Sequence, residues 1–169
     1  MRDEPFDMLS TYLDDHRAGA AAGRALSKRM ARENSDIGWA EKLADLADEI
    51  EADDRTLGQL RRVLGIRGGL AKRALARVAA AAGRLKLNRR LVGYSPLSRV
   101  LEAEAMMAGV TAKKCLWVAM RTCDNPGDQT AQFDFAALEK RALDQIQLLT
   151  EFHAASAKAA FSGNASQTI

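Results

Sequence analysis

The chain has 169 residues, with 25 Lys and Arg against 22 Asp and Glu and a formal net charge of +3. It holds only three prolines and 5% aromatic residues, whereas alanine occurs 32 times. Strands favour β-branched and aromatic residues and helices favour alanine, so this composition excludes a β-sandwich or barrel and predicts an all-α protein. A chain of this length can bury one hydrophobic core without disulfides.

The cysteines and the N-terminal residues predict a cytoplasmic location. Cys115 and Cys123 are the two cysteines and lack CxxC spacing, which argues against a disulfide framework. The first residues are acidic where a signal peptide needs a basic stretch, and no apolar run is long enough to cross a membrane. Helical spacing places Cys115 with Val118 in the core, whereas Cys123 lies near a loop.

Hydrophobic periodicity and capping residues predict five helices in one domain of residues 1–162, followed by a disordered tail at 163–169. The expected helices span about 6–32, 36–64, 70–90, 97–122 and 135–161. The expected boundary residues are Ser35 or Asp36 as the second N-cap, Gly65 after that helix, Ser95 with Pro96 at the fourth start, and Asp134 as the last cap.

The lengths of the connections predict how the long helices are arranged. Short loops make helices 6–32 and 36–64 one antiparallel hairpin, and helices 97–122 and 135–161 another. The connection between the hairpins is long and contains the basic helix 70–90. We therefore expect an antiparallel four-helix bundle of two hairpins joined by a long crossover.

Each long helix interrupts its apolar stripe with a polar residue. The first has His16, with Asp14 and Asp15 beside it. The stripe of the second helix, predicted from Trp39 to Leu64, contains Asp53, with Glu49 one turn earlier. The stripe of the third long helix runs through Leu97, Leu101 and Cys115 and contains Glu104. The stripe of the last helix contains Gln145, with His153 at its edge. Counting residues from the hairpin loops puts His16 level with Asp53, and Glu104 level with His153. The sequence therefore predicts one polar layer at the middle of the bundle.

Two hairpins, a long crossover and this polar layer resemble the ferritin-like superfamily. The resemblance implies a di-metal carboxylate site for iron or manganese, which would bind or oxidise the metal. The ligands it implies are Asp15 or His16, Glu49, Asp53, Glu104 and His153. The sequence departs from the family's Glu-x-x-His motif, because Ala52 stands three residues after Glu49.

A satisfied polar network is the other interpretation of the same residues. His16 would then pair with Asp53, and Glu104 would bond Gln145 or His153. Buried charges are costly unless they are paired, so such pairing is the ordinary outcome in a helical core. No catalytic residue is predicted from this arrangement.

The positive charge is concentrated in the middle of the chain. Residues 55–100 carry 12 basic side chains and no acidic one, whereas residues 1–54 carry 7 basic and 14 acidic side chains. The basic segment could bind nucleic acid or an anionic membrane surface, or it could pack against the acidic stretch 36–54. The candidate anion-binding residues are Arg67, Lys72, Arg73, Arg77, Arg84, Lys86, Arg89 and Arg90.

These patterns favour a non-enzymatic structural or interaction protein, with a stress-related role as one option. A di-metal protein is the first alternative, and an anion-binding module is the second. The small residues Gly19 and Gly23 permit a close approach of helices, which indicates tight packing or a dimer seam. We therefore expect a homo-oligomer, dimer or larger.

Overall fold

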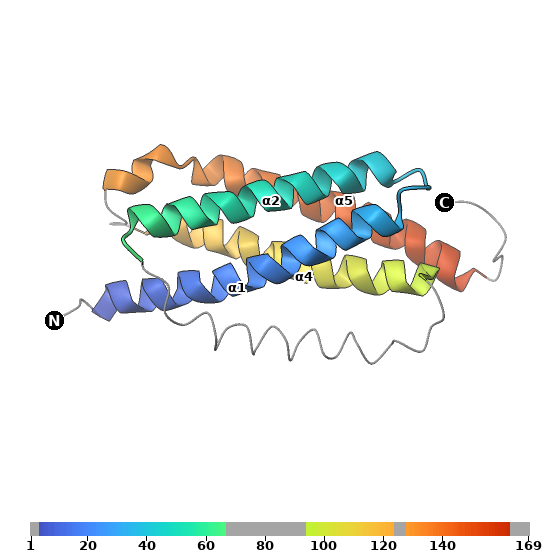
Figure 1. Ribbon diagram of the computed structural model, residues 1–169, viewed down its shortest axis with the longest axis horizontal. Coiled ribbons are helices and arrows are strands. Elements are labelled where there is room, and N and C mark those ends of the chain that lie inside the picture. The colour runs from blue at the N-terminus through green and yellow to red at the C-terminus, as the bar shows by residue number, and fades with distance from the viewer. Residues whose placement is uncertain (1–3, 67–93, 124–127, 163–169) are drawn as a thin grey trace.

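The computed structural model describes residues 4–66, 94–123 and 128–162, and these residues form an all-helical bundle (Figure 1). The long helices are α1 (Glu4–Glu33), α2 (Ala40–Val63), α4 (Pro96–Thr122) and α5 (Phe135–Phe161), and a 3-10 turn, η1 (Asp128–Gln132), precedes α5. No strand occurs within these ranges. The predicted fold class, an antiparallel four-helix bundle, is confirmed.

The four helices form two hairpins (Figure 1). α1 packs against α2, α4 packs most extensively against α5, and α1 also contacts α4. α2 ends at the opposite end of the bundle from the start of α4 (Figure 1). The predicted helix 70–90 in that connection, and the predicted tail 163–169, lie outside the described residues.

Three of the predicted helix boundaries are confirmed in atomic detail. Ser95 is the N-cap of α4, where its hydroxyl accepts from the Ser98 backbone N–H at 3.2 Å and Pro96 occupies the first turn. Asp134 caps α5 by accepting from the Ala137 N–H at 2.9 Å. Gly65 follows α2 with a φ of +67°, a left-handed conformation that glycine adopts without steric cost.

The predicted start of α2 was wrong. α2 begins at Ala40 with Trp39 as its N-cap, and no side chain caps it, whereas Ser35 or Asp36 was expected in that role. The residues before it form tight turns, in which the Ile37 N–H donates to the Asn34 carbonyl at 3.4 Å. The chain therefore needs a longer connection between α1 and α2 than the sequence indicated.

The core is aliphatic along α2 and aromatic where α2 and α4 meet α5. Trp39 packs edge-on against Phe152 with ring centroids 5.4 Å apart, and Trp117 stacks on Phe135 at 6.3 Å. The buried aliphatic side chains of α2 are Leu43, Leu46, Ile50, Leu57 and Leu60, as its stripe predicted. No helix in the described part of the chain is long and apolar enough to span a membrane.

The apolar stripe of α4 lies on a different face from the predicted one. Its buried residues include Val100, Met106, Val110, Trp117 and Met120. Leu97 and Leu101 are only partly buried, and Cys115, predicted to be in the core, is exposed. A phase error of about one residue in a 3.6-residue repeat explains the difference.

Candidate functional site: a buried charged cluster beside an apolar pocket

The Asp53 carboxylate lies at the centre of a charged cluster that joins the two hairpins. It is 3% exposed and forms ion pairs with Lys113 of α4 and Arg141 of α5. Gln145 of α5 completes the cluster: its amide nitrogen donates to Glu49 of α2 at 2.8 Å, and its amide oxygen accepts from Lys113. We call these five residues the Asp53 cluster.

Burial controls the electrostatics of the Asp53 cluster. Removal of Lys113 from water lowers the pKa of its ammonium group below the ordinary 10.5, and the nearby Asp53 charge only partly opposes this effect. A buried carboxylate that receives two cations and an amide is fully paired, which is the arrangement that makes buried charge tolerable. The cluster therefore holds its charges in ion pairs.

Two neighbouring acids are neutralised within the first hairpin. Asp54 is buried and pairs with Arg17 and Arg24 of α1, the latter at 3.2 Å. Asp14 of α1 is also buried and pairs with Arg61 of α2. Adjacent residues of α2 thus face in different directions, because Asp53 reaches the second hairpin and Asp54 reaches α1.

A second buried cluster closes the end of the bundle where α1 finishes and α4 begins. Asn34 is fully buried; it donates to the Tyr94 hydroxyl at 2.8 Å and accepts from Arg99 Nε at 2.7 Å. The Tyr94 hydroxyl donates to the Glu102 carboxylate at 2.9 Å, and Arg29 pairs with the same carboxylate at 2.9 Å. Burial raises the pKa of both Tyr94 and Glu102. We call these five residues the Asn34 cluster.

The structure does not gather the residues that the ferritin-like resemblance implied as metal ligands. Glu49 and Asp53 belong to the Asp53 cluster, whereas Glu104 is exposed and lies 3.1 Å from His153. His16 is half-buried on α1 and Asp15 is exposed beside it. Among the residues that the structure describes, no three His, Cys, Asp or Glu side chains are grouped so that they could hold a metal ion.

The polar-network interpretation predicted one pair correctly and missed the partners of another. Glu104 and His153 meet at 3.1 Å, as their equal depth in the second hairpin indicated. Asp53 pairs with Lys113 and Arg141, and not with His16, as that interpretation expected. His16 and Asp53 do line the same pocket.

Sequence reasoning missed the cations of the Asp53 cluster. Lys113 lies between Val110 and Trp117 on the observed buried stripe of α4, and Arg141 lies one turn before Gln145 on α5. A cation at these positions signals a buried ion pair once the phase of the helix is known. The phase error in α4 hid that signal for Lys113.

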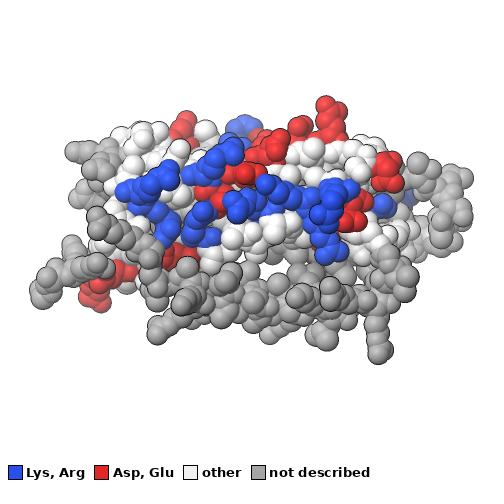
Figure 2. All heavy atoms as spheres, in the orientation of Figure 1, with Lys and Arg blue, Asp and Glu red and all other residues white. Residues whose placement is uncertain are grey.

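The eight residues predicted to bind anions, Arg67 to Arg90, lie outside the described residues. The acidic stretch 36–54 was expected to pair with them, and the structure shows which partners two of its acids have. Glu51 pairs with Lys28 of α1 at 2.7 Å, and Asp54 pairs with Arg24. Figure 2 shows basic and acidic side chains interleaved on the face of the bundle that is seen in Figure 1. Cations of α1 therefore already neutralise part of the acidic stretch.

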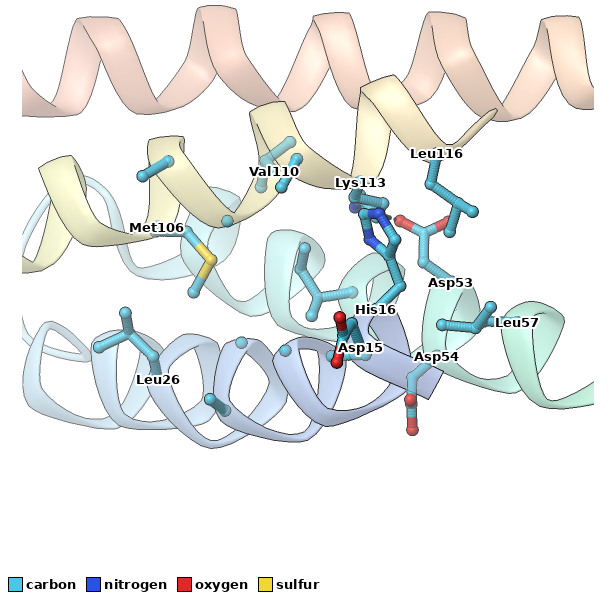
Figure 3. Close-up of a pocket in the computed structure, with 18 of the residues that line it drawn as sticks. Asp15, His16, Leu26, Asp53, Asp54, Leu57, Met106, Val110, Lys113 and Leu116 are labelled. Atoms are coloured by element: carbon cyan, nitrogen blue, oxygen red, sulfur yellow. Dashed lines mark hydrogen bonds and ion pairs between the residues drawn. The ribbon is translucent and has the colours of Figure 1, made fainter. Parts of the chain in front are cut away.

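A pocket of about 640 Å³ opens beside the Asp53 cluster, between α1, α2 and α4 (Figure 3). We call it the central pocket. Apolar groups dominate its wall, with Leu26 and Met106 toward one end. His16, Asp53 and Lys113 lie together farther along the pocket, and Leu57 and Leu116 lie beyond them. The pocket therefore has an apolar wall interrupted by one polar group of side chains.

Small residues of α1 and α4 create the central pocket. Gly19 and Gly23 of α1 and Gly109 of α4 line it, and a Cβ atom built on any of them meets no atom of the described residues within 4 Å. The expectation that Gly19 and Gly23 mark tight packing was therefore wrong for this chain. The missing side chains leave open space between the two helices.

Two polar side chains, Trp117 and His16, are among the residues that line the central pocket. Trp117 is fully buried, and its indole Nε1 has no hydrogen-bond partner among the described residues. Burial lowers the pKa of His16, against the opposing effect of Asp15, and so favours the neutral imidazole. Buried donors without acceptors are uncommon in native proteins and call for an explanation.

Comparison with known proteins gives no match: no family model, curated protein or solved structure is similar to this chain. Two features of the described residues can therefore bear on function. One is the Asp53 cluster, which joins three helices. The other is the central pocket beside it.

Proposed function

We propose that this chain is a non-enzymatic helical-bundle protein that acts by binding, and that the Asp53 cluster holds its two hairpins together. One observation carries the proposal: the buried Asp53 carboxylate pairs with Lys113 and Arg141 from both helices of the other hairpin. General acid–base catalysis and metal binding both need a carboxylate whose oxygens can reach substrate or metal. Asp53 instead directs them to fixed cations of the same chain.

Electrostatics favour this role over the di-metal alternative. A divalent ion at Asp53 would lie beside the positive charges of Lys113 and Arg141, which repel it. The other carboxylate of the layer, Glu49, accepts a hydrogen bond from Gln145. The polar layer would then serve structure in place of metal chemistry.

Metal loading of the purified chain tests the proposal. After incubation with Fe²⁺ or Mn²⁺ under anaerobic conditions and removal of free metal, we expect elemental analysis to find far less than one ion per chain. Asp53→Asn should leave this background unchanged, as should the matched control Asp144→Asn, which alters an exposed carboxylate of α5. Stoichiometric metal that disappears in Asp53→Asn and persists in Asp144→Asn would overturn the proposal.

The predicted homo-oligomer and cytoplasmic location stay predictions. The glycines that suggested a dimer seam, Gly19 and Gly23, line the central pocket. Light scattering on the purified chain measures its mass directly. A mass above that of the 18.4 kDa monomer is the expected result.

A further inference from the structure

We infer that Lys113 binds an apolar aldehyde covalently in the central pocket, through an iminium between its Nζ and the carbonyl carbon. This inference rests on the proposed function and deepens it, because it names the chemical class that the protein would bind. Lys113 lines the central pocket, and its side chain is 15% exposed. The amine of a desolvated lysine is the protein group that forms Schiff bases with carbonyl compounds.

The gap between α1 and α4 leads to this amine. Gly19 of α1 and Gly109 of α4 line the pocket and are both exposed. A Cβ atom built on either glycine meets no atom of the described residues within 4 Å. Lys113 follows Gly109 by one helical turn, about 6 Å along α4. An aldehyde that enters beside Gly109 therefore arrives next to Lys113.

The contacts of Lys113 leave one position on Nζ for the reaction. Nζ donates to the Asp53 carboxylate and to the Gln145 amide oxygen, and an ammonium group has three N–H donors. After loss of the third proton the amine keeps both hydrogen bonds and directs its lone pair away from these two acceptors. Burial lowers the pKa of Lys113, which makes that loss easier.

His16 is placed to take the proton. Figure 3 shows its ring beside Lys113 in the wall of the pocket. Burial lowers the pKa of His16, so its imidazole is neutral at pH 7 and has a nitrogen that accepts a proton. The site thus pairs a nucleophile with a base that Asp53 does not occupy.

The reaction balances with these groups. His16 accepts one proton from the ammonium group, and the free amine adds to the carbonyl carbon to form a carbinolamine. His16 then returns the proton to the carbinolamine hydroxyl, which leaves as water while the C–N bond becomes an iminium. The net change is ammonium plus aldehyde to iminium plus water. Because the iminium keeps the positive charge and one N–H, the buried ion pair with Asp53 persists.

The wall of the pocket favours an apolar substituent on the aldehyde. Leu26 and Met106 lie on one side of the polar group, and Leu57 and Leu116 lie beyond it. The volume of about 640 Å³ is within the range of about 300–1,000 Å³ that is typical of small-molecule sites. An alkyl chain in this space leaves water for apolar contacts, so a long-chain aldehyde should bind better than a short one.

Reductive trapping tests the inference in the full chain. We would incubate the protein with equimolar decanal and sodium cyanoborohydride at pH 7, digest it, and locate the decyl groups by mass spectrometry. The expected label on Lys113 exceeds that on Lys114 or on Lys140, whose side chain is 74% exposed, by at least about tenfold. Equal labelling of the three lysines, or none on Lys113, would overturn the inference.

Two lysine variants provide a matched control for the site. Lys113→Arg keeps a cation for Asp53 but cannot form an imine, so it should lose the main label while its circular dichroism stays helical. Lys140→Arg makes the same change at an exposed position of α5 and should keep the label. Total labelling that is unchanged in Lys113→Arg would contradict the assignment to Lys113.

Chain length and one glycine test the apolar part of the site. Propanal should label Lys113 more slowly than decanal, and Gly109→Leu, which fills the pocket, should slow the reaction with decanal. Gly58→Leu makes the same change on α2 outside the pocket and should leave the rate unchanged. Equal rates for the two aldehydes, or an unchanged rate in Gly109→Leu, would overturn binding in the pocket.

The two proposals fail separately. Stoichiometric metal that depends on Asp53 would overturn the proposed function, whatever the labelling shows. Absent labelling of Lys113 in a chain that takes up no metal would overturn this inference alone.

Discussion

The two buried clusters solve the same problem in different ways. The Asp53 cluster joins the hairpins at mid-height and relies on full charges, since Asp53 pairs with Lys113 and Arg141. The Asn34 cluster joins α1 to α4 at the end of the bundle through one ion pair, Arg29 with Glu102, and through two neutral groups, the Asn34 amide and the Tyr94 hydroxyl. A buried ion pair is strong, but removing one partner is costly because the other charge stays buried without a counter-charge.

The difference also reverses the effect of pH on the two clusters. In the Asp53 cluster burial lowers the pKa of a base, Lys113. In the Asn34 cluster burial raises the pKa of an acid, Glu102. In both cases loss of water disfavours the charged form. The same physical cause therefore makes one cluster more stable, and the other less stable, as the pH rises.

The largest expected effect comes from Asp53→Asn. The variant leaves the largely buried Lys113 and the half-buried Arg141 without their counter-charge, so we expect the free energy of unfolding to fall by about 3–5 kcal/mol. Urea denaturation followed by circular dichroism measures the change. Adding Lys113→Met to Asp53→Asn should recover part of the loss, because one unpaired cation is then absent. A loss below about 1 kcal/mol for Asp53→Asn would contradict the proposal that the cluster holds the two hairpins together.

A smaller loss is expected when the neutral member of the Asn34 cluster is removed. Asn34→Ala removes hydrogen bonds to Tyr94, Arg99 and the Met30 carbonyl, but leaves no unpaired acid, because Glu102 keeps Arg29. We expect a loss of about 1–3 kcal/mol by the same denaturation measurement. If Asn34→Ala proved as costly as Asp53→Asn, the contrast between losing a neutral partner and losing a charged one would fail.

The smallest expected effects are the opposite pH slopes. The folded pKa of Lys113 lies below 10.5, so between that pKa and 10.5 the unfolded chain binds more protons at this site. The contribution of Lys113 to stability therefore rises with pH across this window. Denaturation at several alkaline pH values should show a slope that is reduced in Lys113→Met. An identical slope in the variant would count against the lowered pKa.

Glu102 should act in the other direction on the acidic side. Its folded pKa lies above 4.5, so between 4.5 and that pKa the folded chain binds more protons at this site. Its contribution to stability is fully present below 4.5 and is lost as the pH rises through the folded pKa. Glu102→Gln, which keeps an acceptor for Tyr94, should flatten this decline. A steeper decline in Glu102→Gln would reverse the sign we expect.

How much of the site the sequence could predict depends on what each residue requires. Gln145 was placed on the apolar stripe of α5, and it is 2% exposed in the Asp53 cluster. Asp53 was placed in the same way on α2. A polar residue inside a strong helical period is visible without a structure. Its partners are not visible, because they come from other helices whose rotation the period fixes only to within about a residue.

The central pocket shows a similar limit to what the sequence can predict. Gly23 and Gly109 are conspicuous in the sequence, but small residues fit both close packing and open space. Which outcome applies depends on the distance between α1 and α4. That distance is decided by the side chains packed elsewhere between the helices.

The sequence by itself determined the all-helical fold, the ends of α4 and α5, and the presence of buried polar residues, because these depend on local propensity, capping and periodicity. Only the tertiary structure decided which cations meet Asp53, which acid stays exposed beside His16, and where a pocket opens. These features depend on the rotation and spacing of whole helices. Both are set by the packing of many side chains at once.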